Sequence, residues 1–199
     1  MDYQEAPDMI FESIVISTDQ AGNPHIAPFG VRKQQGLIMI APFRPSASLD
    51  NLLSQRVATL NMTDDVRVFA GALTGRRDWP VFAASRIKGH VLRNALSHHE
   101  LELVNMIEDA IRPQLHFKVV HEENHAPFQG FNRAQAAVVE LAVLVSRLNM
   151  LEPEKINAEI GYLEIAINKT AGPRELEAWG WLMEAVENHR AAMNGENLA

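Results

Sequence analysis

The chain has 199 residues, of which 47% are hydrophobic and 22% are charged, and its formal net charge is −7. This is the composition of a globular protein, and a negative charge without any Lys/Arg run argues against a general nucleic-acid binder. No apolar run approaches the roughly 18 residues of a membrane-spanning helix, so we expect no membrane partner either.

Short strands separated by turns are expected through the first three quarters of the chain. Runs of β-branched residues, alternating apolar and polar positions and clusters of turn formers predict antiparallel strands with short connections. The expected strands are Phe11–Thr18, His25–Val31, Leu37–Ile40, Arg56–Met62, Arg86–Arg93, Glu100–Ile111, Leu115–Val120 and Ala136–Leu148. Glu100–Ile111 also fits a helix face. Ala136–Leu148 is assigned to a strand for its valines and could cross a barrel fully.

Helices are expected at three places. Pro42 and Pro45 end the sheet, and Ser46 begins a short helix. Near the C-terminus, apolar residues recur at helical spacing on both sides of a Gly-Pro turn. The expected helices are 46 to about 53, Glu154–Asn168 and Pro173–His189, and 64–79 is expected to be a loop with one helical turn. We therefore expect a mainly β fold: about seven antiparallel strands closed as a barrel in residues 1–150, then a helical hairpin in residues 151–199.

Residues 44–52 (Arg-Pro-Ser-Ala-Ser-Leu-Asp-Asn-Leu) form the most informative segment. They place the Arg44 guanidinium and the hydroxyls of Ser46 and Ser48 at the start of a helix, directly after an apolar strand. Helix N-termini carry unsatisfied N–H groups and a positive dipole end, and Arg adds a bidentate fork, so the segment is suited to a phosphate. The other interpretation is that Ser46 only caps the helix and Arg44 is a solvated surface charge.

Other segments carry groups suited to a planar ligand. The strand residues 27–30 (Ala-Pro-Phe-Gly) would present backbone to a ring edge, and Asn61 and Thr63 could hydrogen-bond a heterocycle. In residues 128–133 (Phe-Gln-Gly-Phe-Asn-Arg), aromatic rings, an amide and Arg133 could cover a ring and pair with an anion. This segment is equally well explained as a packed loop anchor, and the acidic pair 64–65 as a solvated turn.

Several classes of site are not expected. The chain lacks the P-loop, Rossmann and G-x-S-x-G motifs, and it contains no cysteine. Its histidines lack the i, i+4 spacing of a helical metal site, and the adjacent His98 and His99 would point to opposite faces of a strand, so no metal site is predicted. Residues 1–9 are acidic and polar, unlike a signal peptide, and we expect a cytoplasmic location.

Five motifs occur in order from about Phe11 to Val186: H-I-A-P-F-G, P-F-R-P-S-A-S-L-D-N-L, N-M-T-D-D-V, F-Q-G-F-N-R-A and K-T-A-G-P-R-E-L-E-A-W. Together they resemble the domain-of-unknown-function 447 family, whose members are similar to the flavin-reductase-like, FMN-binding split β-barrels. The resemblance implies a homodimeric, antiparallel split β-barrel of the FMN-binding type, with FMN as the cofactor near the dimer interface.

The resemblance also implies a site. Arg44, Ser46 and Ser48 match the positions that bind the flavin phosphate, and strand residues line the isoalloxazine. Phe29 stands where many relatives have Met, and the two Ser residues stand where Thr is frequent. With the residues singled out above, the expected cofactor-binding residues are Pro28, Phe29, Gly30, Arg44, Ser46, Ser48, Asn51, Asn61, Thr63, Asp64, Asn132 and Arg133. No catalytic residue is assigned.

The expected function is that of a flavoprotein, with FMN-dependent oxidation or reduction of a small molecule. Kinship implies a link to tetrahydromethanopterin-dependent one-carbon metabolism, which nothing in the residues themselves indicates. The alternative is a non-catalytic FMN carrier, sensor or scaffold. A third hypothesis is that the helical hairpin, with Trp179 and Trp181 on different faces, docks another protein.

Overall fold

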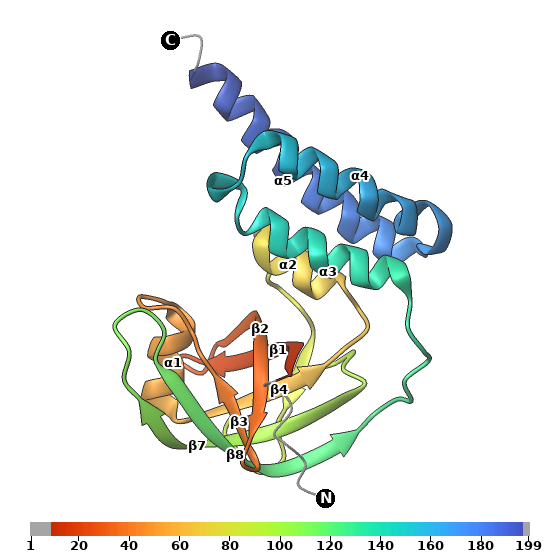
Figure 1. Cartoon of the computed structure of the whole chain (residues 1–199). Coiled ribbons are helices and arrows are strands. Elements are labelled where there is room, and N and C mark those ends of the chain that lie inside the picture. Colours follow the sequence, from red (N-terminus) through yellow and green to blue (C-terminus); the bar gives the residue numbers. More distant parts are fainter. Residues whose placement is uncertain (1–8, 197–199) are drawn as a thin grey trace, which may run out of the picture. The chain divides into compact units, whose positions relative to one another are not determined.

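The computed structural model describes residues 9–196. Residues 1–8 of the segment that we expect not to be a signal peptide lie outside this range. The chain forms two compact units, coloured by sequence in Figure 1. The barrel unit contains the residues up to 63 together with 78–128, and the helical unit contains 64–77 together with the residues from 129 onward. This division differs from the expected one at residue 150, because two helices that precede residue 150 belong to the helical unit.

The barrel unit contains a closed antiparallel barrel of six strands, in the order β1-β2-β3-β8-β7-β4. The strands are β1 Ile10–Thr18, β2 Pro24–Gln34, β3 Leu37–Ile40, β4 Val57–Met62, β7 Ser97–Ile107 and β8 Gln114–Asn124. The expected antiparallel barrel is confirmed, with six strands in place of about seven. Alternate residues of the strands face a buried apolar core that includes Val15, Leu60, Leu101 and Phe117. This alternation of apolar and polar faces is what made the strands recognisable in the sequence.

A separate two-stranded sheet of β5 (Val81–Ala83) and β6 (His90–Leu92) replaces the strand expected over 86–93. The first part of that segment is not a strand for a local reason. The backbone N–H groups of residues 85–87 donate to the carboxylate of Glu100 and are therefore not available for a ladder. The following residues reverse the chain to form β6.

The expected strand Ala136–Leu148 is wrong: the segment is a helix, α3 (Arg133–Val145). Its buried residues are Ala134, Ala137, Val138, Leu141, Ala142 and Leu144, which follow helical spacing. The valines suggested a strand through their intrinsic preference, which tertiary packing overrides here. The Asn132 side chain caps α3 by accepting hydrogen bonds from Ala134 N at 2.7 Å and Gln135 N at 3.3 Å.

The helical unit buries a second apolar core. Besides α3, it contains α2 (Arg67–Leu73), a 3₁₀ turn (Leu148–Met150), α4 (Pro153–Thr170) and α5 (Pro173–Glu196). The C-terminal hairpin of α4 and α5 is confirmed, and its Ile156, Ile160, Leu182 and Val186 lie in the core. The two tryptophans of α5 are both partly buried against this core. None of the helices in residues 9–196 combines the length and apolarity needed to cross a lipid bilayer.

The turn between α4 and α5 is fastened to the start of α3. Asn132 Nδ2 donates to the carbonyl of Thr170 at 3.1 Å, and the Thr170 hydroxyl accepts from Ala134 N at 3.1 Å. Glu175 is buried and accepts from Gln135 Nε2 and from Gly172 N. Polar residues of the motifs F-Q-G-F-N-R-A and K-T-A-G-P-R-E-L-E-A-W thus join the start of α3 to the turn between α4 and α5.

A buried ion pair lies at the start of α2. The Asp65 carboxylate is fully buried and accepts from Arg67 Nε at 2.8 Å and Nη2 at 2.7 Å. Burial raises the pKa of Asp65, but the hydrogen bonds and charge of Arg67, with the charge of Arg174, outweigh it and place the pKa below its usual value. Arg67 also reaches Glu177 of α5 at 3.0 Å, so the pair connects two helices.

Replacing Arg67 with Met should destabilise the protein by about 3 kcal/mol, because it leaves a buried carboxylate without its bidentate guanidinium. Urea unfolding followed by circular dichroism measures the change. Arg76→Met is the control, since Arg76 pairs with Glu184 at the surface, and it should cost less than about 2 kcal/mol even with the loss of its contact with Trp181. Equal losses in the free energy of unfolding for the two variants would show that the buried ion pair stabilises the protein no more than the surface pair does.

Asn132→Ala should lower the free energy of unfolding by about 0.5–2 kcal/mol, because Gln135 N loses the acceptor Oδ1, Ala134 N keeps only the Thr170 hydroxyl, and the bond from Asn132 Nδ2 to the Thr170 carbonyl is lost. Asn149→Ala, at an exposed residue, should change it by less than about 0.5 kcal/mol. The same urea titration compares the two variants. An Asn132→Ala variant as stable as the parent would contradict the capping role.

Candidate functional site

The N-terminus of α1 (Ala47–Gln55) has the features of an anion site. Ser46 is its N-cap, and the Ser46 hydroxyl accepts from Leu49 N at 3.2 Å. The N–H groups of Ala47 and Ser48 have no acceptor among residues 9–196. Two backbone donors therefore point outward at the positive end of the helix dipole, which is the arrangement that binds phosphate groups. Ser46 therefore caps the helix through Leu49 N, and the N–H groups of Ala47 and Ser48 are left without an acceptor among residues 9–196.

Arg44 precedes this helix and is held by the turn between β7 and β8. Its backbone N–H donates to the carbonyl of Ile111 at 2.8 Å, and its guanidinium pairs with Glu108 at 3.2 Å. The side chains of Arg44 and Glu108 are 43% and 66% exposed. An ion pair so exposed contributes little to stability, so an anion can compete with Glu108 for the guanidinium at small cost.

A second arginine, Arg112, lies in the turn between β7 and β8, which also contains Glu108. It was not predicted from the sequence as a site residue. Its Nε and Nη2 donate to the carbonyl of Ala41 at 3.3 and 3.1 Å, and its guanidinium lies over the Phe43 ring at 4.5 Å. The Asp109 carboxylate fixes the loop by accepting from Arg112 N at 2.6 Å. Arg112 is far from α1 in sequence and belongs to no motif, so only the pairing of β3 with β8 could have revealed it.

The rest of α1 is anchored on the barrel. Leu49 and Leu52 are buried in the barrel core, and Ser48 is buried as well. Asn51 Nδ2 donates to the hydroxyl of Ser17 on β1 at 3.3 Å. Leu49, Leu52 and Asn51 therefore fix the position of the helix on the barrel.

Within residues 9–196, strand β2 has an unpaired backbone edge at Pro28, Phe29 and Gly30. These residues pair with β1 on one side, whereas the pairing with β3 begins only at Arg32. Proline is tolerated in a strand with a partner on one side only. The Phe29 ring packs against the barrel core, so this segment presents backbone rather than the aromatic face. A Cβ at Gly30 would lie 2.7 Å from Cγ2 of Ile10, which explains the glycine by close packing.

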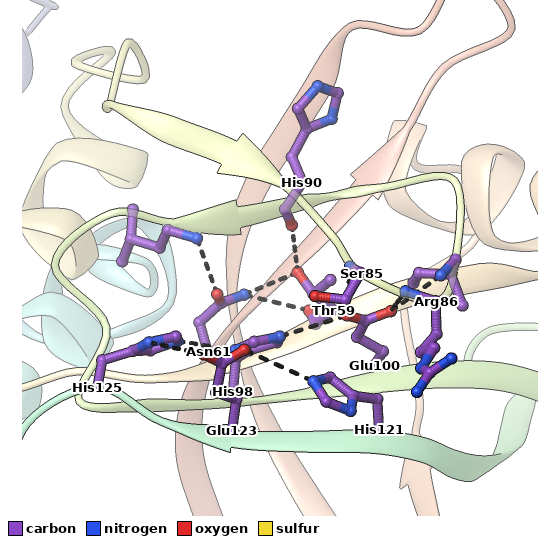
Figure 2. A network of polar contacts seen from close by, with 12 residues as sticks. Thr59, Asn61, Ser85, Arg86, His90, His98, Glu100, His121, Glu123 and His125 are labelled. Carbon is purple, nitrogen blue, oxygen red and sulfur yellow. Dashed lines mark hydrogen bonds and ion pairs between the residues drawn. The ribbon is translucent and has the colours of Figure 1, made fainter.

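The side chains of Asn61, which Figure 2 shows, and of Thr63 form hydrogen bonds within the barrel unit. Asn61 is completely buried: its amide nitrogen donates to the carbonyl of Ile14 and the hydroxyl of Thr59, and its oxygen accepts from Leu92 N at 2.9 Å. The Thr63 hydroxyl donates to the carbonyl of Asn94 at 3.1 Å. Asn61 thus positions strands, and its polar atoms are already hydrogen-bonded.

The remaining expected residues belong to the helical unit. Asp64 is half-buried before α2, Asn132 is the cap of α3, and Arg133 is the exposed first residue of α3. The structure therefore brings the residues at the start of α1 together with β2 in the barrel unit. Asp64, Asn132 and Arg133 are placed in the other unit, and their binding roles stay predictions.

Solved structures share this fold. An FMN-bound DUF447 protein from Methanosarcina mazei matches with a TM-score of 0.76 and 20% identity, over 90% of this chain and 96% of that chain. BorF, the flavin reductase component of a bacterial two-component tryptophan halogenase, matches with a TM-score of 0.51 and 16% identity, over 60% and 83% of the two chains. An FMN-binding protein from Thermus thermophilus matches with a TM-score of 0.50 and 16% identity, over 62% and 74%. The fold is therefore that of the flavin-reductase-like proteins, as expected.

Two family models match consecutive parts of the chain. The model described as the N-terminal domain of a protein of unknown function (DUF447) matches residues 11–126, and the second DUF447 model matches residues 132–184. The short gap between them coincides with the end of the barrel segment at residue 128. On these matches, which span most of its length, the chain belongs to the DUF447 family.

Proposed function

We propose that the protein is a flavoprotein that binds FMN on its barrel unit, with the phosphate at the N-terminus of α1. The observation that carries the proposal is the pair of open N–H donors at Ala47 and Ser48, next to the exposed guanidinium of Arg44. A phosphate dianion needs such a concentration of donors and positive charge. The FMN-bound relative from the same family supports the choice of ligand.

Each group of residues has a distinct part in this proposal. Arg44 moves from Glu108 to the phosphate, and Ser46 holds the first turn of α1 in place through its cap. The backbone edge of β2 at residues 28–30 faces the polar edge of the isoalloxazine. Asn61 acts at a distance by fixing β1, β4 and β6 through its amide. FMN when bound supplies hydride or electron transfer, and the chain supplies binding, orientation and electrostatics.

The finer parts of the proposal follow from the family resemblance. They are a homodimer with the flavin near its interface, a cytoplasmic location, and FMN-dependent oxidation or reduction of a small molecule linked to tetrahydromethanopterin. The similarity in fold to a flavin reductase supports an oxidoreductase. A non-catalytic FMN carrier, sensor or scaffold is the competing function.

Arg44→Ala should weaken FMN binding by about 1.5–3 kcal/mol, because a charge-assisted hydrogen bond to the phosphate is lost. This corresponds to about a 10- to 150-fold higher Kd, measured by the quenching of flavin fluorescence when the purified protein is titrated into FMN. Riboflavin, which lacks the phosphate, should bind the parent and the variant equally.

Lys118→Ala is the matched control, because Lys118 is also an exposed, ion-paired cation on the barrel, with Glu102 at 2.8 Å. It should leave the Kd for FMN unchanged. An Arg44→Ala variant with the parent's Kd would return Arg44 to the role of a surface charge, and failure of the parent to bind FMN would overturn the proposal.

Turnover separates the enzyme from the carrier. The oxidoreductase proposal expects bleaching of the flavin absorbance by NADH, NADPH or a reduced pterin under anaerobic conditions, and recovery when an acceptor is added. Each reductant is compared with the same amount of free FMN, so that only acceleration by the protein counts. Bound FMN that no reductant bleaches faster than free FMN would favour the carrier.

A further inference from the structure

A compact group of histidines and carboxylates lies on β7 and β8, beside the β5–β6 sheet (Figure 2). In the strand register, Glu100 is opposite His121, and His98 is opposite Glu123. Because side chains alternate along a strand, these four residues share one face, which is opposite to that of the core residue Leu101. His98 and Glu100 are completely buried. The group is therefore a polar layer outside the barrel core.

The Glu100 carboxylate is fixed by backbone groups of the loop between β5 and β6. Its Oε1 accepts from Ser85 N at 2.6 Å, and its Oε2 accepts from Arg86 N at 2.7 Å and Ile87 N at 2.9 Å. Burial raises the pKa of Glu100, but these hydrogen bonds outweigh it and place the pKa below its usual value. A completely buried negative charge is thus maintained, with a lone pair of Oε1 still available.

His98 is held in one orientation by its neighbour. Its Nδ1 and the Nε2 of His125 are 2.9 Å apart. Its other nitrogen, Nε2, is buried, has no hydrogen-bond partner in the described part of the chain, and lies 3.5 Å from Oε1 of Glu100. That separation is longer than the 2.7–2.9 Å typical of a charge-assisted hydrogen bond. Burial lowers the pKa of His98 against the opposing effect of Glu100, which favours the neutral imidazole.

His121 contributes a second imidazole nitrogen without a hydrogen bond. Its Nε2 is buried, has no hydrogen-bond partner among the described residues, and lies 3.5 Å from Oε2 of the half-exposed Glu123. One ligand atom each from His98, Glu100 and His121 lie within 4.8 Å of one another. One nitrogen from each of the two imidazoles and one carboxylate oxygen are therefore near enough to one another to be ligands of a single ion.

We propose that His98, Glu100 and His121 form a binding site for a divalent transition-metal ion, with Zn²⁺ as the best-suited ion. Two imidazoles and one carboxylate are a ligand set that zinc uses in proteins, and the ion satisfies all three groups at once. Mg²⁺ and Ca²⁺ prefer oxygen ligands, so the two imidazoles disfavour them.

The geometry of the group agrees with this ion. Zinc bonds of about 2.0–2.1 Å place tetrahedral ligand atoms about 3.3–3.4 Å apart, close to the separation of His98 Nε2 and Glu100 Oε1. The other separations are at most 4.8 Å, and the partly exposed His121 ring can move to shorten them. His125 is then an outer-shell partner, because a ligating histidine usually donates its other N–H to a neighbouring acceptor.

The site connects elements that the barrel ladder alone does not join. Glu100 holds the loop of the β5–β6 sheet, and His121 comes from β8. A bound ion would thus tie that loop to two barrel strands. The three ligands come from two paired strands rather than from a helix, so the i, i+4 spacing of a helical metal site does not apply to them.

The proposal is tested with full-length, tag-free protein stripped of metal by a chelator, into which Zn²⁺ is titrated calorimetrically. The expected result is one saturable Zn²⁺ site per chain and a higher thermal midpoint in the presence of Zn²⁺. His121→Gln and His98→Gln should abolish this binding, and His125→Phe should weaken it about 10- to 100-fold. The readout does not involve flavin, so it is independent of the proposed FMN site.

His99→Gln is the matched control, because His99 is the next residue of β7 and its side chain lies on the other face, near Glu122. It should bind Zn²⁺ as the parent does. If His98→Gln fails to fold by circular dichroism, His121→Gln decides, since its ring is partly exposed. Absence of a saturable site in the parent, or retention of full affinity by a folded His121→Gln variant, would overturn the proposal.

Discussion

The structure of the barrel unit depends on the hydrogen bonds that replace water around the buried Glu100 carboxylate. Away from water, the ionised group relies on three backbone N–H donors from residues 85–87. Those donors exist only if the chain leaves extended geometry there, so Glu100 determines where β5 and β6 can form. Asn61 completes the arrangement by joining β4 to β1 and to Leu92 of β6. The polar groups outside the barrel core thus specify how the β5–β6 sheet is joined to the barrel, which apolar packing alone would not determine.

Much of the fold could be predicted because its strands and helices carry the ordinary periodicities. The alternation in β4, which places Ala58 and Leu60 in the barrel core, and the helical spacing of Ile156, Ile160 and Ile167 in α4 are direct consequences of facing a core. The error at α3 has a physical cause as well. A segment rich in Val and Ala is compatible with either geometry, and the decision is made by the Asn132 cap and by helices α4 and α5, which are distant in sequence.

The candidate site was predictable only in part, and the division is physical. Ser46 and Arg44 are local features, since a cap and its flanking charge lie within a few residues of one another. Arg112, the partnership of Arg44 with Glu108 and the meeting of His98 with His121 all depend on strand register, which no local pattern encodes. Asn61 is the opposite case. It begins the N-M-T-D-D-V motif, and its side chain holds strands of the barrel unit together. A residue that was expected to bind a ligand is therefore used to hold the fold together.

The open edge of β2 has a consequence for how this protein meets other chains. Strand backbone that has no ladder partner on one side is a template to which an extended peptide can pair. The edge is short, because pairing with β3 resumes at Arg32, and it contains Pro28, which has no N–H to donate. A neighbouring strand would find too few donors to build a ladder, whereas a flat heterocycle needs only a few. The short edge with few N–H donors therefore both disfavours aggregation through strand pairing and suits a small ring.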